Sequence, residues 1–194
     1  MVARQSTEAR QQQIAEAALK ILSEQGLRRF TTTAIAKEVG IAEGTIFRHF
    51  PNKMAIVDAA LDRAEEVLFA GFPPVDPDPL VRLGLFFEQR IKVSQSHYNI
   101  VRLIQSEQLV HASKGAAADR ITRWKVRSVD FLRGCLAEAK AAGMLREGVD
   151  VQTLAIIVHG SLIGFVLAGN PRPGAKAPEA AKLWSTIKTL ISAC

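Results

Sequence analysis

The residues best suited to chemistry are gathered between positions 31 and 53, in the segment TTTAIAKEVGIAEGTIFRHFPNK. Three threonines open this segment and a lysine closes it, and hydroxyl and ammonium groups commonly donate to phosphate oxygens. Between them lies a run whose polar and aromatic side chains are suited to the base edges of a DNA groove. The candidate DNA-contacting residues are Thr31, Thr32, Thr33, Glu43, Gly44, Thr45, Phe47, Arg48, His49 and Lys53.

Two short helices, predicted at about 32–39 and 43–50, position these groups. Gly40 between them supplies a turn of positive φ that other residues resist. A second helix held at a steep angle by such a turn is typical of a helix-turn-helix. Gly44 costs roughly 1 kcal/mol of helix stability, and close approach to a phosphate would be a reason to keep it. The alternative is an ordinary helical hairpin, in which the threonines cap and Phe47 packs. The predicted inward-facing residues are Ile35, Ala36, Val39, Ile46 and Phe50.

No pattern typical of an enzyme or a metal centre accompanies this segment. The sequence has no H-E-x-x-H, C-x-x-C, P-loop or G-x-S-x-G motif. Glu107 and His111 are four residues apart on a predicted helix and could share a metal, but we favour an exposed ion pair. His159 is interpreted as an interface histidine and Cys135 as a core residue. We therefore expect no catalytic residue, no metal and no cofactor.

The composition fits a helical chain in a reducing compartment. Its 194 residues, 48% of them apolar, suffice for one full-sized domain or for a small domain joined to a larger one. Two cysteines imply no disulfide framework, so we expect a cytoplasmic protein. The start, MVARQSTEARQQQ, lacks the apolar segment of a signal peptide. The most apolar run, 154–169, contains His159 and Ser161 and is judged too short for a bilayer, so we expect no membrane partner.

The positive charge is concentrated away from the candidate DNA surface. The net charge is +6 overall, but residues 1–81 hold nine basic and eleven acidic side chains, whereas residues 82–146 hold twelve and five. A DNA-binding surface in the first part must therefore depend on a few placed groups and not on a broad basic field.

The whole chain follows the 3.6-residue period of helices, and no stretch alternates like a strand. The proline-rich segment GFPPVDPDP, residues 71–79, is the clearest junction. We predict an all-α protein with a DNA-binding domain at residues 1–52 and a second domain at 53–194, the helix at 53–70 connecting them. The other predicted helices are an N-terminal one ending at Gly26 and those at about 80–95, 97–112, 119–142, 151–169 and 179–192.

The segment FTTTAIAKEVGIAEGTIFRHFPNK, with IAEAALKILSEQG before it and AIVDAAL after it, resembles the N-terminal signature of the TetR family of bacterial one-component transcriptional regulators. The resemblance covers residues 10 to about 60. It implies a nine-helix, Ω-shaped homodimer that binds a palindromic operator, usually represses, and releases DNA when a ligand enters its C-terminal domain. It places the threonines and Lys53 at the DNA backbone, and Thr45, Phe47, Arg48 and His49 on the recognition helix.

Two positions depart from the family pattern. Position 42 is usually serine or threonine, and Ala42 forfeits about 1 kcal/mol of helix capping. Position 47 is usually tyrosine, and Phe47 keeps the ring for a thymine methyl but lacks the hydroxyl. Glu43 suits the start of a helix but repels phosphate, unless it accepts from a cytosine N4. We expect fewer phosphate contacts than usual and a shallower salt dependence.

The helices at 80–95, 97–112 and 119–142 are predicted to line a ligand pocket, although a wall residue of this kind is more often plain core. The stripe Arg120, Arg123 and Arg127 reads by default as a solvated face. The basic excess of this region nevertheless suggests an anionic inducer, such as a fatty acid or acyl-CoA. The candidate ligand-binding residues are Phe86, Phe87, Arg90, Leu103, Ile104, Trp124, Arg127 and Phe131.

The last two predicted helices carry small and apolar residues that suit a dimer. Gly160, Gly164 and Ala168 are spaced so that two helices can approach closely, and two helices from each copy would form a four-helix interface. The alternative is packing inside one chain. The candidate dimer residues are His159, Gly160, Gly164, Ala168, Leu183, Trp184, Ile187 and Ile191.

Together these patterns predict a ligand-responsive, DNA-binding transcriptional regulator whose partners are duplex DNA, a second copy and a small molecule. The rival interpretation is a helical module that binds a ligand or a protein, with weak or no specific DNA binding because of Ala42 and Phe47. An all-helical enzyme is a distant third.

Overall fold

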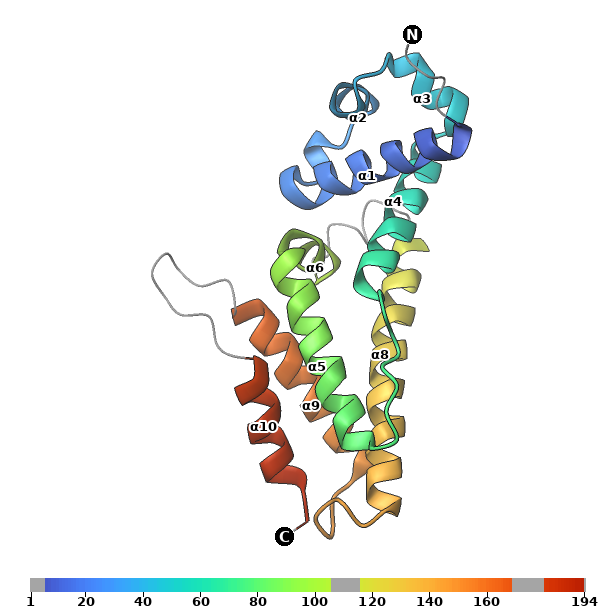
Figure 1. Cartoon of the computed structure of the whole chain (residues 1–194). Coiled ribbons are helices and arrows are strands. Elements are labelled where there is room, and N and C mark those ends of the chain that lie inside the picture. Colours follow the sequence, from blue (N-terminus) through green and yellow to red (C-terminus); the bar gives the residue numbers. More distant parts are fainter. Residues whose placement is uncertain (1–5, 106–115, 169–179, 194) are drawn as a thin grey trace. The chain divides into compact units, whose positions relative to one another are not determined.

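The computed structural model describes residues 6–105, 116–168 and 180–193 (Figure 1). Within these residues the chain forms α-helices, one 3-10 helix at Leu27–Arg29 and a single antiparallel bridge between Leu145 and Ser192, without any β-strand. The all-α prediction is therefore confirmed. The α-helices are α1 (Thr7–Gln25), α2 (Thr32–Val39), α3 (Glu43–His49), α4 (Lys53–Leu68), α5 (Pro79–Ser96), α6 (Tyr98–Gln105), α8 (Ala116–Ala141), α9 (Val151–Ala168) and α10 (Ala180–Ile191).

Local side chains fix where most of the early helices begin and end. A side-chain oxygen that accepts from a backbone N–H in the first turn satisfies a donor that the helix itself leaves unpaired. Gly26 takes φ 76° and ends α1, as the glycine signal indicates. The capping residues are Ser6 on α1, Thr31 on α2, Asn52 on α4 and Asp78 on α5.

The described chain forms two compact units, the first of which comprises Met1–Leu68 and Asn99–Ile121. In this unit α1 packs along α4 and across α2 and α3. Burying one large aliphatic or aromatic side chain stabilises the fold by roughly 1.5–3 kcal/mol, so this core holds the helix-turn-helix in place. Its fully buried large side chains are Ile14, Ile21, Leu22, Phe30, Ile35, Ile46 and Ile56.

The boundary of the first unit differs from the predicted one at residue 52. Helix α4 belongs wholly to the first unit because Ile56, Val57, Ala60, Leu61 and Ala64 are buried along it. Arg120, in the second turn of α8, holds α4 further along: its Nη2 lies 2.5 Å from Asp62 Oδ1 and 2.8 Å from Glu65 Oε2.

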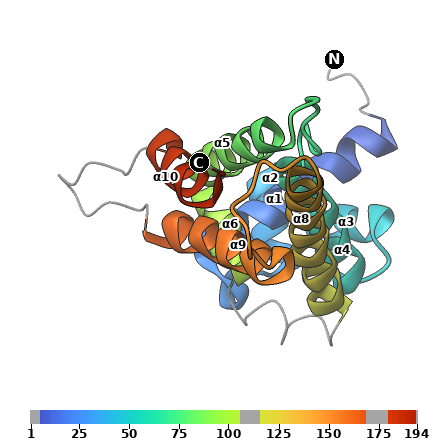
Figure 2. The ribbon, with the colours of Figure 1, turned by 90° about the horizontal axis from the view of Figure 1, so that it is seen from below.

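The second unit comprises Phe69–Tyr98 and Thr122–Cys194. Helices α5, α9, α10 and the greater part of α8 lie side by side in it (Figure 2). Arg82 on α5 donates to Glu138 on α8, and Trp184 on α10 lies against Phe87 on α5 with ring centres 5.3 Å apart. The core residues of this unit include Leu83, Phe86, Phe87, Leu132, Leu136, Ala155 and Val158.

Candidate nucleic-acid interface and ligand site

Helix α3 buries one face and exposes the other. Ile46 is fully buried, while Phe47 beside it is 53% exposed and Arg48 is exposed. The Arg48 Nη2 donates to Thr45 Oγ1 at 2.8 Å, so these two residues form one polar pair on the outer surface. Exposing a large aromatic ring to water on this seven-residue helix is unfavourable. Contact with a partner would remove the ring from water.

Of the two glycines in this region, Gly40 makes the turn between α2 and α3 that the sequence predicts. Gly40 takes φ 74° and ψ 38°, the left-handed conformation, and the following Ile41 N–H donates to the Ala36 carbonyl at 3.0 Å. Gly44 differs from Gly40 in its backbone, which is helical, and a Cβ added at either glycine meets no atom within 4 Å. The chain's own packing therefore does not require glycine at position 44.

The three threonines are all engaged within the chain. Thr31 Oγ1 accepts from the Ala34 N–H at 3.1 Å and caps α2. Thr32 donates to Glu43 Oε1, and Thr33 donates to Glu43 Oε2 at 3.0 Å. These bonds from Thr32 and then Thr33 lower the pKa of the Glu43 carboxyl. Ala42 makes no side-chain cap at the start of α3, as its type requires.

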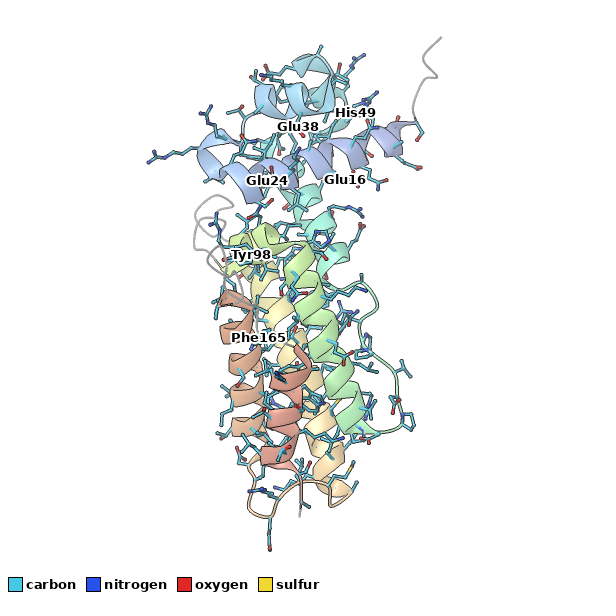
Figure 3. All side chains as sticks on the ribbon, turned by 60° about the vertical axis from the view of Figure 1, so that its left-hand side comes forward. Glu16, Glu24, Glu38, His49, Tyr98 and Phe165 are labelled. Carbon is cyan, nitrogen blue, oxygen red and sulfur yellow. The ribbon has the colours of Figure 1, made fainter. Side chains whose placement is uncertain are left out.

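Lys53 and His49 lie at the far end of the helix-turn-helix. Lys53 is the first residue of α4, is exposed, and places its Nζ 5.0 Å from the centre of the Phe30 ring. The backbone oxygen of His49, which is labelled in Figure 3, accepts from Gln11 Nε2 at 3.1 Å. The His49 Nδ1 is buried and has no hydrogen-bond partner among the described residues. His49 is thus partly a packing residue between α3 and α1.

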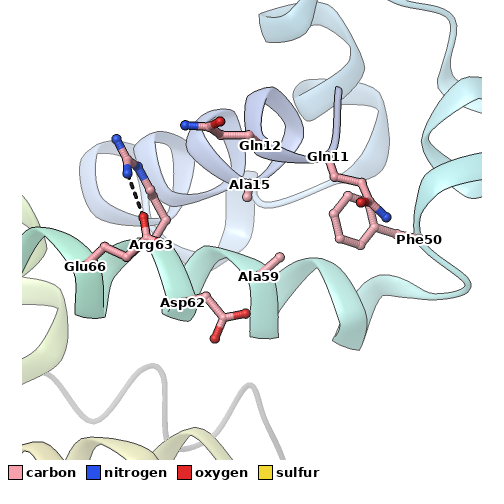
Figure 4. Close-up of a pocket in the computed structure, with 8 residues that line it drawn as sticks. All are labelled: Gln11, Gln12, Ala15, Phe50, Ala59, Asp62, Arg63 and Glu66. Atoms are coloured by element: carbon pink, nitrogen blue, oxygen red, sulfur yellow. Dashed lines mark hydrogen bonds and ion pairs between the residues drawn. The ribbon is translucent and has the colours of Figure 1, made fainter. Parts of the chain in front are cut away.

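A cleft of about 410 Å³ opens between α1 and α4 in the first unit (Figure 4). Asp62, Arg63 and Glu66 give it a charged wall, and Arg63 Nη1 lies 2.6 Å from Glu66 Oε2. None of its lining residues belongs to the predicted DNA-binding, ligand-binding or dimer sets.

Two arginines converge on the same aromatic rings in the second unit. The guanidinium carbon of Arg90 on α5 lies 4.3 Å from the centre of Phe69 and 5.2 Å from that of Phe72. The corresponding distances for Arg127 on α8 are 4.6 and 4.9 Å. Burial, and next the charge of Arg127, lower the pKa of Arg90 to about 10, so it stays protonated at neutral pH.

The predicted aromatic wall residues surround this arginine pair. Phe86 and Phe131 have ring centres 5.3 Å apart, and the Trp124 ring lies 6.4 Å from Phe69. The remaining three candidates are buried: Phe87 lies against Trp184, whereas Leu103 and Ile104 lie on α6, in the part of that helix that belongs to the first unit. Of the predicted arginine stripe, Arg120 pairs with Asp62 and Glu65 on α4, whereas Arg123 and Arg127 are both exposed, and Arg127 places its guanidinium over the phenylalanine rings.

Helix α9 carries an exposed apolar face. Ile156 and Ile157 are 63% and 58% exposed, and Leu167 is 46% exposed. Gly160, Gly164 and Ala168 lie exposed on the same side, one turn apart, and a Cβ at either glycine meets nothing within 4 Å. His159 is half-buried, and burial followed by the charges of Arg90 and Lys125 lowers its pKa.

Two of the predicted dimer residues on α10 pack within their own chain. Trp184 packs against Phe87 and Gly84, and Ile191 is 6% exposed, so both serve the core of their own chain. Leu183 and Ile187 are half-buried on the same side. A helical period shows which residues share a face, not which neighbour covers it, so the dimer role of these four residues stays a prediction.

The apolar helix α9 is longer than the run considered in the sequence. Its 18 residues begin at Val151 and have a mean hydropathy of 1.9, which is enough to cross a membrane by length and composition alone. Only 28% of these residues are buried. The prediction that this run is too short for a bilayer therefore does not hold as an argument from length.

Comparisons with known proteins agree in both halves of the chain. Residues 14–60 match the bacterial regulatory proteins of the tetR family, and residues 79–170 match the tetracyclin repressor-like C-terminal domain. The nucleoid occlusion factor SlmA of Vibrio atlanticus (strain LGP32) is 31% identical over 169 residues, which cover 81% of this chain and 84% of that protein. The chain belongs to the TetR family.

Solved structures of transcriptional regulators share its fold. A TetR transcriptional regulator from Chloroflexus aurantiacus J-10-FL superposes with a TM-score of 0.79 at 16% identity, covering 97% of this chain and 98% of that one. The transcriptional regulator FadR from Bacillus subtilis, solved in complex with stearoyl-CoA, gives 0.69 at 21% identity, covering 92% and 95%. The chain is thus a DNA-binding regulator of the TetR family, and the relatives named here are regulators or an occlusion factor.

Some features of this TetR protein were not foreseen from the sequence. Phe69 and Phe72 are not among the predicted ligand candidates, although Phe72 lies within the proline-rich junction and Phe69 lies just before it. The contact of Glu43 with two threonines was also missed, because the partners lie ten and eleven residues apart. Glu107 and His111, the weak metal candidate, lie outside the described residues. No group of three or more potential metal ligands occurs in the part of the chain that the structure describes.

Proposed function

We propose that this chain is a cytoplasmic, homodimeric transcriptional repressor that binds a palindromic operator through α3 and is released by a small hydrophobic anion. The main support for DNA binding is that α3 has a buried side and an exposed side. Ile46 is buried and anchors the helix, while Phe47 and Arg48 face outward. Thr45, paired with Arg48, extends that surface. Arginine and an exposed ring are suited to guanine and to thymine methyl groups in the major groove.

The backbone contacts are proposed for Thr31 and Lys53, and for Thr32 and Thr33 only when their hydroxyls are released from Glu43, with Gly44 leaving room for the DNA strand. Lys53 stands exposed at the start of α4, where backbone N–H groups add to its charge. Gly44 has open space where a side chain would extend. We assign no catalytic step to any residue.

The dimer is proposed to form over α9. Its exposed isoleucines and small residues form one apolar face, and a second copy would remove that face from water. Two copies of an operator-reading head on one two-fold axis would match a palindrome. Leu190 on α10, 63% exposed, is proposed to lie at the edge of that interface.

The inducer is proposed to carry an anionic group. Arg90 and Arg127 stand against the same two rings, and an anion bound to both would offset the repulsion of like charges. Phe86 and Trp124 are buried and Phe131 is half-buried in the apolar packing beside the pair, so the rest of the molecule would enter between these rings. The FadR relative of the same fold, solved with stearoyl-CoA, supports a ligand that combines an acyl chain with negative charge.

A selection of genomic fragments with the purified protein, followed by footprinting, tests the DNA part. We expect one protected site with two-fold symmetry, and recovery of fragments without any shared symmetric sequence would contradict it. Deletion of the gene is then expected to raise the transcripts next to the site.

Nucleoid occlusion is a second candidate, because the relative with that name matches both halves of the chain at 31% identity. Genome-wide binding separates the two functions. A repressor predicts transcript changes beside its sites in a deletion strain. For an occlusion factor, we expect binding sites without such transcript changes. We also expect the deletion strain to form division septa over the nucleoid.

A further inference from the structure

The first turns of the two helices in the helix-turn-helix are joined by one carboxylate. Glu43 is the first residue of α3, while Thr32 and Thr33 are the first two of α2. Each carboxylate oxygen accepts one threonine hydroxyl, Oε1 from Thr32 and Oε2 from Thr33. Glu43 is exposed, so it adds a negative charge to the surface that faces outward.

A threonine hydroxyl has a single hydrogen to donate, and phosphate oxygens only accept. Thr32 and Thr33 therefore cannot hold Glu43 and a DNA phosphate with the same O–H groups. A carboxylate also presents two acceptor oxygens and a negative charge, which are the features that these hydroxyls would meet in a phosphate.

We propose that Glu43 acts as an internal phosphate mimic that occupies the donors of Thr32 and Thr33, and so makes this residue a determinant of DNA specificity. The inference rests on the proposed DNA-binding role of α3. Binding to arbitrary DNA depends mainly on phosphate contacts, and it is reduced because two donors are occupied and a like charge is near. An operator is held also by base contacts, so it is affected less.

The contact also compensates for Ala42. Helix α3 has seven residues, contains Gly44 and has no capping side chain. The two threonines hold its first residue from the neighbouring helix instead, and their hydrogen bonds lower the pKa of Glu43, so the carboxylate stays charged to lower pH.

Fluorescence anisotropy with the full chain tests the proposal on two labelled duplexes, one of arbitrary sequence and one carrying the selected operator. Glu43→Gln removes the charge and keeps one carbonyl oxygen, and Glu24→Gln, on exposed Glu24 of α1, is the matched control. We expect Glu43→Gln to bind the arbitrary duplex about tenfold more tightly with a steeper salt dependence. Its operator affinity should rise less, so the specificity ratio falls. Glu24→Gln should change neither affinity by more than about twofold.

The double variant Thr32→Val with Thr33→Val distinguishes the mimic from a general charge effect. In the wild-type background these hydroxyls are already occupied, so their loss should leave arbitrary-duplex affinity within about twofold. In the Glu43→Gln background their loss should remove most of the gain. This arm also serves if Glu43→Gln alone is poorly folded, because the triple variant and the threonine pair can be compared by thermal unfolding.

Three outcomes overturn the proposal: an equal gain for Glu24→Gln, no gain on the arbitrary duplex, or loss of operator binding alone, which would make Glu43 a base-reading residue. Failure of the proposed DNA function looks different, because the wild type would then show no preference for any operator. The comparison on the arbitrary duplex would still report on Glu43.

Discussion

Trp184 closes over Gly84 so tightly that a single methyl group would not fit between α10 and α5. A Cβ built on Gly84 would lie 2.7 Å from Trp184 Nε1 and 2.9 Å from its Cδ1. The indole also lies against the buried Phe87 ring, with ring centres 5.3 Å apart, so it cannot shift toward that side. The small residue on α5 therefore sets how closely α10 approaches.

Gly84→Ala is expected to lower the free energy of unfolding by about 1–3 kcal/mol, because an overpacked contact must shift backbone or side chain. Gly134→Ala is the matched control, since Gly134 is exposed on α8 and a Cβ there meets nothing within 4 Å. It should gain up to about 1 kcal/mol from helix propensity. Urea unfolding measures both, and equal stability for the two variants would contradict the packing argument.

Gly164→Glu is expected to convert the proposed dimer into a monomer, because it places a charge in the middle of the apolar face of α9. Sedimentation velocity measures the change in mass. Leu85→Glu, at a 39% exposed apolar site on α5, should leave the dimer intact. A dimer that persists in Gly164→Glu would place the interface elsewhere.

Lys53→Ala is expected to weaken binding to all duplexes alike and to reduce the slope of log K against log salt by about one unit. The reason is the loss of one phosphate contact and its released counterion. Lys92→Ala, a change of the same charge at an exposed position on α5, is the control. If both variants change the slope equally, Lys53 acts only through net charge.

His159 predicts a loss of stability in acid. Burial, with the nearby charges of Arg90 and Lys125, holds its pKa below the ordinary value of 6.5 in the folded chain. As pH falls below 6.5, the unfolded chain takes up the proton first, so the free energy of unfolding decreases until the folded pKa is reached. His159→Gln should lose this component. Urea unfolding at pH 7.5 and at lower pH would contradict the account if wild type and variant changed in parallel.

The arginine pair predicts selectivity for anions. A long-chain fatty acid should raise the melting temperature, whereas its methyl ester and a cationic amphiphile should raise it less. Arg90→Met and Arg127→Met should each reduce the shift because both guanidinium groups lie over the Phe69 and Phe72 rings, and Arg123→Met, at an exposed arginine on the same helix as Arg127, should not. Equal shifts from the acid and its ester would show that the charge is not recognised.

The helix-turn-helix could be read from the sequence because its signals are local. The helix predicted at 32–39 begins and ends where α2 does, since Thr31 caps it and Gly40 takes the left-handed turn. The alternation of buried Ile46 and exposed Phe47 follows from the helical period.

The sequence does not predict which helix surfaces pack against one another. The periods of α4 and α10 identify their apolar faces, but not that α4 packs along α1 or that Trp184 meets Gly84. Arg90 and Arg127 both contact the Phe72 ring. Phe72 lies in an irregular segment, where no helical period predicts which way a side chain faces. The Glu43 contact was missed for a similar reason, because a charge at a helix start gives no sign of its partner.

The most direct test of the central claim, that α3 reads DNA sequence, is a comparison of wild type with Arg48→Ala. Anisotropy titrations on the selected operator and on an arbitrary duplex give the ratio of the two dissociation constants for each protein. The account predicts a clear preference in the wild type and a loss of about 1–3 kcal/mol of that preference in Arg48→Ala. An unchanged ratio, with both affinities reduced together as for Lys53→Ala, would contradict base reading by this residue.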